Sequence, residues 1–187
     1  MTDSVRSIAP AAPPLVRKHG GLACDTRGVA IVEFAIVAAP FIALLIAILQ
    51  TSLVFFVQQN LETTAEKSVR QLMTGEAQKA GMGKAAFKES VCKKLPAFMK
   101  CENLMVDVQT AASFGDAAPT APVLTMSGNT VTNNWKYTPG GPGTINVVRV
   151  MYVWNVQAGP LGFDLATMST GQRLLFATAV FKTEPYS

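Results

Sequence analysis

The fold of this 187-residue chain is decided by the stretch Arg27-Gly28-Val29-Ala30-Ile31-Val32-Glu33-Phe34 and the uncharged run that follows it as far as Val57. The hydrocarbon core of a bilayer is crossed by about 20 apolar residues of helix, so this run is long enough to span a membrane. The sequence therefore predicts a leader over residues 1–28, a transmembrane helix over residues 29–57, and an extramembrane part that follows it.

The leader is predicted to stay in the cytoplasm. It contains four Lys and Arg side chains against two Asp, and an excess of basic residues favours the cytoplasmic side of a membrane. A secretory signal peptide is the alternative, but such signals have an apolar core of about 7–15 residues followed by a small-residue cleavage site. Here the apolar run is longer and no Ala-x-Ala pattern closes it. Cleavage before the run would instead leave the apolar helix on the mature chain.

The helical pattern continues beyond the apolar run. Gly75 is suited to end a helix, because glycine adopts the left-handed conformation common at this position. We therefore expect one helix from Val29 to about Thr74, in which residues 58–75 form a periplasmic continuation of the membrane segment. Within the run, the polar step at residues 50–52 is open to two interpretations, bonds to other helices or a place in the outer interface. The apolar residues that recur at helical spacing on one face of the continuation are Leu61, Ala65, Val69 and Leu72.

Residues 76–187 are predicted to form a periplasmic α+β head. An amphipathic segment presents apolar residues from Phe87 to Phe98 on one face, and its lysines are interpreted as solvated, with a patch for anionic lipid as the alternative. Alternating apolar residues predict strands near 104–109, 145–156 and 172–182. These strands would form a small antiparallel sheet packed on the long helix. Residues 112–143 are rich in Gly, Pro, Ser, Thr and Asn and are predicted to be a long surface loop.

Two cysteines, Cys92 and Cys101, lie near the end of the amphipathic segment. In an uninterrupted helix they would be about 13.5 Å apart, too far for a disulfide. Pro96 lies between them and can break the helix, so that the chain doubles back. A disulfide is then expected in an extracytoplasmic head; two unpaired thiols, the alternative, would indicate a cytoplasmic one.

The composition gives little support to catalysis or to binding of nucleic acid. The single histidine, His19, lies in the leader, so we expect no metal site. There is no glycine-rich phosphate loop and no recognisable pair of catalytic side chains, so we expect neither an enzyme nor a cofactor. Asp107, Asp116 and Asp164 stand alone and are interpreted as solvated surface acids. The net charge of +4 is scattered rather than gathered in a basic stripe, which argues against nucleic acid as a partner.

The junction at the start of the apolar run resembles the class III signal of type IV-like prepilins. Gly28, four further residues, Glu33 and Phe34 precede the long apolar helix in that pattern. In detail the chain is similar to the TadE-like minor pilins or pseudopilins of tight-adherence (Flp, type IVb-like) pilus systems. Three further segments carry this resemblance: Ala35–Phe41, Val147–Trp154, and Ala177–Tyr186 with its Glu-Pro-Tyr ending, to which chemistry alone gives no role.

The resemblance implies a processing site and an assembly segment. Cleavage would fall between Gly28 and Val29, performed by a membrane-embedded aspartyl prepilin peptidase. Glu33 and Phe34 would then take part in assembly with other pilin or pseudopilin subunits and with the pilus assembly platform. The fold that it implies is pilin-like, a long N-terminal transmembrane and stalk helix with a small sheet head.

Glu33 is open to two interpretations. An ionised carboxylate at the centre of a membrane helix costs about 2.5–3.5 kcal/mol, and such residues are functional candidates. Near the cytoplasmic edge the cost is smaller, because the helix dipole offsets about 0.3–1 kcal/mol of it. In the first interpretation Glu33 pairs with the new α-ammonium group of Val29 in a neighbouring subunit and fixes the helix register. In the second, it snorkels to the headgroups and only marks the interface.

We therefore expect a single-pass protein of the inner membrane, with a cytoplasmic N-terminus and a periplasmic head, acting as a structural subunit in surface attachment or secretion. Incorporation into an extracellular pilus is left open. The alternative is an uncleaved, signal-anchored periplasmic protein whose head binds a ligand or an envelope partner.

Overall fold

The computed structural model of the protein describes residues 28–117, 122–128 and 130–186. The chain divides into two compact units, residues 1–41 and 42–187. Of the first unit only residues 28–41 are described, so the predicted leader lies outside the described residues except for Gly28.

Helix α1 (Val29–Met73) has 45 residues and confirms the predicted helix within one residue of its expected end. The chain leaves it through Gly75, whose φ of 77° lies in the left-handed region that glycine adopts without a steric penalty. The predicted apolar face is buried in the head along the last part of α1. Its buried residues after Gln50 are Val54, Val57, Leu61, Thr64, Ala65, Ser68, Val69 and Leu72.

The head contains an antiparallel sheet of three strands, β1 (Leu104–Ala111), β4 (Ile145–Asn155) and β5 (Gln172–Lys182), with β4 in the centre. Val106 of β1 lies opposite Val150 of β4, which lies opposite Ala177 of β5. The three strands match the three predicted segments, and the α+β fold class is confirmed.

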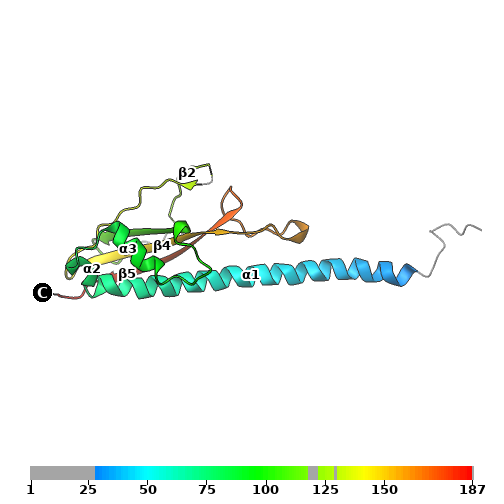
Figure 1. The fold of residues 1–187 in the computed structure, drawn as a ribbon, viewed down its shortest axis with the longest axis horizontal. Helices are drawn as coiled ribbons and strands as arrows, with labels where there is room; N and C mark the ends of the chain where they lie inside the picture. Colours follow the sequence, from blue (N-terminus) through cyan, green and yellow to red (C-terminus); the bar gives the residue numbers. More distant parts are fainter. Residues whose placement is uncertain (1–27, 118–121, 129, 187) are drawn as a thin grey trace, which may run out of the picture. The chain divides into compact units, whose positions relative to one another are not determined.

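Helix α1 and the short helix α3 (Lys84–Cys92) pack together with the sheet in one hydrophobic core (Figure 1). Phe87 and Val91 of α3 are fully buried in this core, as are Val148 and Val150 of the central strand. Each such side chain contributes about 1.5–3 kcal/mol through burial. Between α1 and α3 lies the single-turn helix α2 (Glu76–Lys79).

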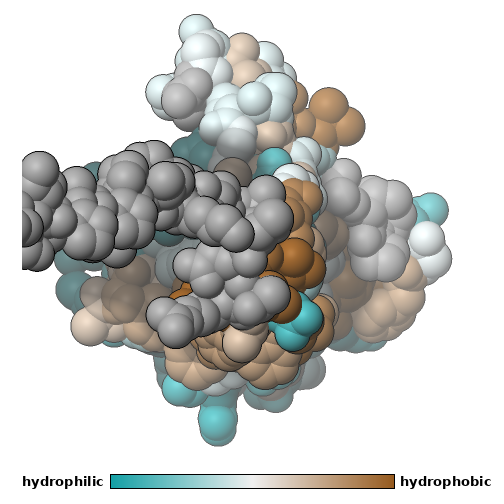
Figure 2. All heavy atoms as spheres, turned by 90° about the vertical axis from the view of Figure 1, so that its right-hand side faces the viewer, coloured by the Kyte–Doolittle hydropathy of each residue, from teal (hydrophilic) through white to brown (hydrophobic). Residues whose placement is uncertain are grey.

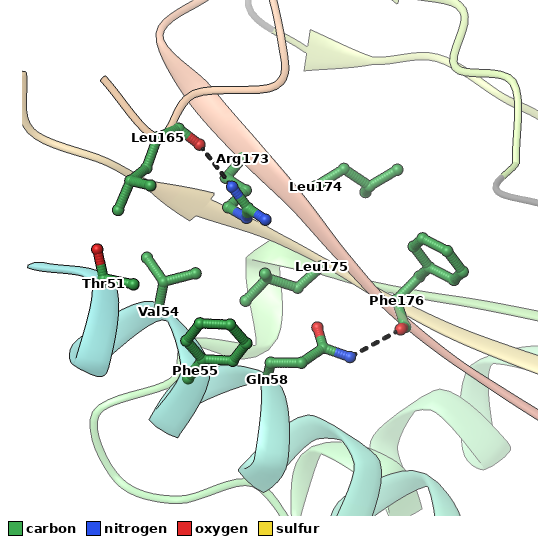
Figure 3. A pocket seen from close by; sticks show the side chains of 9 residues that line it. All are labelled: Thr51, Val54, Phe55, Gln58, Leu165, Arg173, Leu174, Leu175 and Phe176. Carbon is green, nitrogen blue, oxygen red and sulfur yellow. Dashed lines mark hydrogen bonds between the residues drawn. The ribbon is translucent and has the colours of Figure 1, made fainter. Parts of the chain in front are cut away.

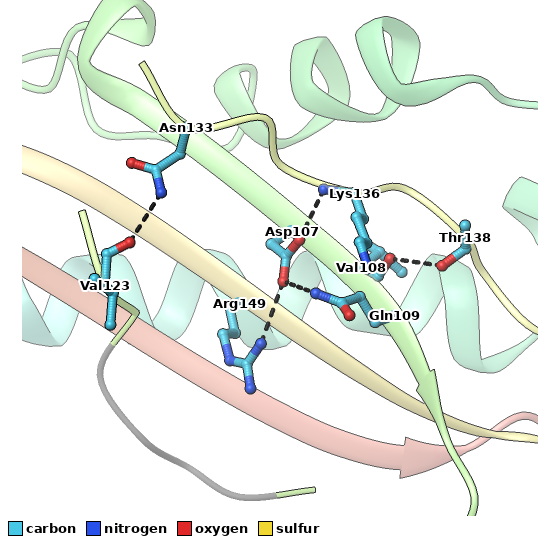
Figure 4. A network of polar contacts seen from close by, with 8 residues as sticks. All are labelled: Asp107, Val108, Gln109, Val123, Asn133, Lys136, Thr138 and Arg149. Atoms are coloured by element: carbon cyan, nitrogen blue, oxygen red, sulfur yellow. Dashed lines mark hydrogen bonds and ion pairs between the residues drawn. The ribbon is translucent and has the colours of Figure 1, made fainter. Parts of the chain in front are cut away.

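The opposite face of the sheet carries a polar network centred on Asp107 (Figure 4). Asp107 is only 3% exposed, and its Oδ2 atom lies 3.3 Å from Nη1 of Arg149 and accepts a 2.7 Å hydrogen bond from Gln109. Its Oδ1 atom accepts a 2.9 Å bond from the backbone N–H of Lys136. The prediction that Asp107 is a solvated surface acid was wrong, because distant parts of the chain, Lys136 and Arg149, bury and bind its carboxylate. Asp116 and Asp164 are exposed.

The segment predicted as a surface loop, residues 112–143, is partly fixed to the sheet. It contains the two-residue strands β2 (Met126–Ser127) and β3 (Thr130–Val131), which pair with each other. Further on, Val108 of β1 donates a 2.9 Å hydrogen bond to the carbonyl of Lys136 and accepts one of 2.9 Å from Thr138. The end of this segment therefore covers part of the free edge of β1, which would otherwise be open to pairing with another chain.

After α3 the chain turns back at Pro96, where the Met99 N–H donates to the Pro96 carbonyl. This turn brings Cys101, the first residue of the 3₁₀ helix η3 (Cys101–Asn103), next to Cys92 at the end of α3. The structure places the two cysteines at disulfide distance, with Cα atoms 5.3 Å apart.

The Glu-Pro-Tyr ending folds back onto the end of α1. The Glu184 N–H donates a 2.8 Å hydrogen bond to the Met73 carbonyl. The ring of Tyr186 lies against Gly75 so closely that a Cβ atom there would collide with it, and Lys79 Nζ lies 5.5 Å from the ring centroid. The ending thus fastens the C-terminal end of α1 to the strand β5, a role that sequence chemistry did not indicate.

Candidate functional site

The predicted processing and assembly residues lie together at the start of α1. Gly28 is exposed, and a Cβ atom added there meets no other atom within 4 Å. Val29 is the first residue of α1, and Glu33 and Phe34 follow on the exposed surface of its first turns, with Phe34 74% exposed. Among the described residues, Glu33 has no hydrogen-bond or ion-pair partner. Its carboxylate is therefore available to a group outside the described chain.

Helix α1 is long and apolar enough to cross a membrane. Its most apolar stretch has a mean hydropathy of 2.7, and only 6% of that stretch is buried. The core helix of a soluble protein would be mostly buried, whereas this stretch is largely exposed in the described chain, as a membrane-spanning helix would be. Figure 2 looks at the molecule from the right-hand side of Figure 1, and apolar side chains are prominent in the lower half of this face. Large exposed apolar residues of α1 include Ile31, Val32, Ile36, Val37, Phe41, Leu44, Leu45, Ile48, Leu49 and Leu53.

Most of the polar step within the apolar run has hydrogen-bond partners inside the molecule. Thr51 and Ser52 donate 2.8 Å hydrogen bonds to the carbonyls of Ala47 and Ile48, one helical turn earlier. The amide of Gln50 donates to the carbonyl of Gln157 in the head at 3.4 Å. Neither of the two interpretations left open by the sequence included this internal pairing, which reduces the cost of placing polar groups in lipid. The side-chain oxygen of Gln50 is buried without a hydrogen-bond partner among the described residues.

A cavity of about 230 Å³ lies between α1 and β5 (Figure 3). Gln58 crosses one side of it, donating a 3.0 Å hydrogen bond to the Phe176 carbonyl, and Arg173 donates 2.9 Å to the Leu165 carbonyl on the other. Arg173 is the one charged residue among those that line it, and no nucleophile and base are paired there. The lining residues are Thr51, Val54, Phe55, Gln58, Leu165, Arg173, Leu174, Leu175 and Phe176.

Lysines of α3 and the turn after it make specific contacts as well as facing solvent. Lys84 donates to the carbonyl of Trp135, and Lys94 donates 3.0 Å to the carbonyl of Lys67 on α1. Burial lowers the pKa of Lys94 below its ordinary value, an effect opposed in part by the carboxylate of Glu76. These lysines tie α3 and the following turn to their neighbours, which the interpretation as a solvated face did not anticipate.

No cluster of three or more His, Cys, Asp or Glu side chains suited to a metal ion occurs among the residues that the structure describes. Burial raises the pKa of Tyr137, whose ring packs 5.4 Å from the ring of Phe87. Both residues belong to the packing of the head, and neither forms a catalytic constellation.

Sequence reasoning missed three contacts that hold the head to α1 and to itself: Asp107 with Arg149, Gly75 with Tyr186, and Gln50 with the connection after β4. Only the last had a signal in the sequence, because Gln50 is a lone amide after a long series of apolar residues. The other two depend on residues that are far apart in the chain.

Comparison with protein families gives a match at the N-terminal end of the described chain. The family model described as TadE-like protein matches residues 28–70, which begin at the predicted processing glycine and end within α1. A search of curated proteins and a search of solved structures found no match. The match confirms the resemblance over residues 28–70, which are similar to TadE-like proteins, and it does not extend to the C-terminal segments.

Proposed function

We propose that this protein is a minor pilin or pseudopilin of a tight-adherence pilus, a structural subunit without catalytic activity. The proposal is carried by the exposure of Gly28, Glu33 and Phe34 at the start of α1. These residues precede an apolar surface of the helix that no other described residue covers. The TadE-like match begins at the same glycine.

In this proposal the chain is inserted in the inner membrane with its N-terminus in the cytoplasm and its head in the periplasm. A prepilin peptidase cuts between Gly28 and Val29, and the exposed Gly28 gives a peptidase access to that bond. The cut creates an α-ammonium group on Val29. The uncovered surface of α1 then packs against the helices of other pilin or pseudopilin subunits on the assembly platform.

Glu33 has a specific role in this assembly. Its carboxylate lies on the fifth residue of the mature chain and has no partner among the described residues. Pairing with the Val29 ammonium of a neighbouring subunit would remove an unpaired charge from an apolar surface, which is costly in lipid. The pair would also fix the axial register of neighbouring helices, because apolar contacts alone tolerate sliding.

A second candidate is an uncleaved, signal-anchored binding protein, and the cavity between α1 and β5 is the observation that favours it. That cavity has apolar walls with Gln58 and Arg173 at its sides. Its 230 Å³ is below the usual range of about 300–1,000 Å³ for small-molecule sites, so this cavity gives the second candidate only weak support.

The experiment that tests the proposal compares Glu33→Ala with Glu66→Ala in cells that make the pilus. Glu66 is an exposed glutamate on the same helix, so its loss is the matched control. We expect Glu33→Ala to abolish or strongly reduce assembly, measured as the amount of this subunit that cross-links to other pilins, while Glu66→Ala leaves it unchanged. Equal cross-linking in both variants would contradict the role of Glu33. An uncleaved, anchored binding protein would give this equal result.

A further inference from the structure

The connection between β4 and β5, residues 156–171, leaves the sheet and extends beside α1 (Figure 1). The carbonyl of Gln157 accepts the 3.4 Å hydrogen bond from Gln50, and Gly159 is so near that an added Cβ would lie 2.7 Å from the Gln50 side-chain oxygen. The strand β5 itself contacts α1 at Gln58 through Phe176. Since Gln50 and Gln58 are eight residues apart, the connection reaches about 12 Å further along α1 than that strand contact.

This reach brings the connection to the level of lipid. The apolar run of α1 extends from Phe34 to Val57, and about 20 of its residues suffice to cross the hydrocarbon. Taking Phe34, the residue after Glu33, as the first residue in the hydrocarbon, about 20 residues place the outer boundary near Leu53. On this placement Gln50 lies about 5 Å inside the boundary, at 1.5 Å per residue. The part of the head that contacts Gln50 lies at the same depth.

The tip of the connection, Gln157–Phe163, has a composition and hydrogen bonds that suit the membrane boundary. It has no charged residue. The Gly159 N–H donates to the Phe163 carbonyl at 2.7 Å, the Phe163 N–H donates to the Pro160 carbonyl at 3.2 Å, and Pro160 has no N–H to satisfy. Irregular backbone is costly at membrane depth where its polar groups lack partners, and this turn satisfies two of its six N–H groups internally, which suits it to the membrane boundary rather than the bilayer centre.

Leu161 is the most informative residue of the tip. Its φ of 58° places it in the left-handed region, and it is the non-glycine residue with positive φ among those that the structure describes. Its side chain is 85% exposed. In water the molecule would gain nothing from holding a leucine outward in an unfavourable conformation. Among acyl chains the same side chain gains an apolar environment.

We propose that the tip Gln157–Phe163 inserts into the outer leaflet of the membrane beside α1, with Leu161 among the acyl chains. The proposal rests on the proposed function in one respect, that α1 spans a membrane. Arg173, on β5 and within hydrogen-bond reach of Leu165, then lies nearer the anionic headgroups than the tip does. The head is held to the membrane by two elements, α1 and this tip, which fixes its orientation before assembly.

The test uses the full chain reconstituted in phospholipid vesicles, with spin labels attached to single cysteines. Cys24→Ser leaves Cys92 and Cys101, which pair, so that a label reacts only with an added cysteine. Leu161→Cys reports the tip, and Ser169→Cys is the matched control, an exposed residue of the same connection beyond the tip. Leu45→Cys, on the apolar run of α1, reports whether the helix itself is in the bilayer.

We measure the access of each label to oxygen, which partitions into lipid, and to a water-soluble nickel complex. The proposal predicts that the Leu161 label favours oxygen as the Leu45 label does, that the Ser169 label favours nickel, and that protein-to-lipid ratio has no effect. A Leu161 label that matches Ser169 while Leu45 remains in lipid overturns the proposal and leaves membrane anchoring intact. A Leu161 label shielded from both reagents at high protein density overturns it in favour of a second copy. A Leu45 label that favours nickel would refute anchoring as well.

Discussion

Helix α1 presents apolar side chains along nearly all of its length, yet its two halves differ in how those side chains are used. Phe34 and Leu49 in the first half are 74% and 69% exposed, whereas Leu61 in the second half is 0% exposed. The second half also contains small and polar residues on its buried face, such as Ala65 and Ser68, which let the sheet approach closely. The chain thus supplies a partner for one half of the helix and leaves the other half to its surroundings.

This difference shows that hydrophobicity alone does not identify a membrane segment in this protein. Both halves of α1 are rich in apolar residues. The packed half has one apolar and one polar face, whereas the uncovered half has no polar face. A helix that is apolar all round is suited either to a protein core or to lipid. In this structure the first half is exposed, which fits a helix that could span a membrane.

The largest expected effect comes from replacing Leu61 and Leu49, one leucine from each half of α1, with alanine. Leu61→Ala removes a fully buried side chain and leaves a cavity, so the head should lose about 2–5 kcal/mol of stability. Leu49→Ala should change it by no more than about 0.5 kcal/mol, because that side chain makes little contact with the head. Denaturant unfolding of the head in detergent, followed by tryptophan fluorescence, measures both. Equal losses in the two variants would remove the distinction between the halves.

The next prediction concerns a change that lowers the stability of the head, which packs on the second half of α1, and leaves the first half unchanged. Replacing both Cys92 and Cys101 with serine removes the cross-link that holds the turn after α3 against the core, and it should cost about 2–3 kcal/mol. This turn meets the apolar run at its outer end, where the rings of Phe98 and Phe56 stack 5.6 Å apart. Because the rest of the run is unaffected, membrane extraction of the protein should not change. Unfolding of oxidised protein, with the double variant beside it, gives the difference. A loss no greater than that of a surface substitution would show that the pair is not formed.

Gly75→Ala tests how the packed half ends. Alanine is strained at a φ of 77°, and its Cβ would collide with the Tyr186 ring, so we expect a loss of about 1–3 kcal/mol. Gly83→Ala is the control, since a Cβ there meets nothing within 4 Å and its φ is −79°. Combining Gly75→Ala with Tyr186→Ala should remove the collision but not the backbone strain, so the double variant should not lose the sum of the two single losses. Full additivity would mean that the ring and Gly75 are not in contact.

The smallest effect concerns alkaline pH. Burial raises the pKa of Tyr137 above its ordinary value of 10.0, so the folded state favours the neutral phenol. The stability contributed by this preference is present below pH 10 and is lost as the pH rises through the folded pKa. Tyr137→Phe should therefore reduce the decline in melting temperature between pH 9 and pH 11. An identical decline in the two proteins would show that Tyr137 does not contribute to it.

Much of the fold could be predicted from local patterns in the sequence. The end of α1 followed from helical spacing and from Gly75, and the three strands followed from alternation, because both signals repeat within a few residues. Asp107 was misjudged for the opposite reason, since its partners Arg149 and Lys136 lie 42 and 29 residues away. The contact of Tyr186 with Gly75 is of the same kind, and a terminal tyrosine carries no local sign of its position.

The candidate site stays a prediction, and the structure adds a description of its surroundings. Gly28, Glu33 and Phe34 were recognised from their spacing ahead of an uncharged run, and the structure adds that they are exposed. The contact between Gln50 and the connection after β4 was not foreseen, because the turn that carries Gln157 and Leu161 has no repeating pattern. Its importance appears only when its position along α1 is known.

The central claim is that the uncovered half of α1 becomes the N-terminus of the mature subunit. Intact mass and N-terminal sequencing of the membrane-extracted protein, produced with and without prepilin peptidase, test it most directly. The account predicts a chain that begins at Val29 when the peptidase is present and at Met1 when it is absent. A chain that retains the residues before Gly28 in both samples would contradict it and would leave an anchored head with no role in a pilus.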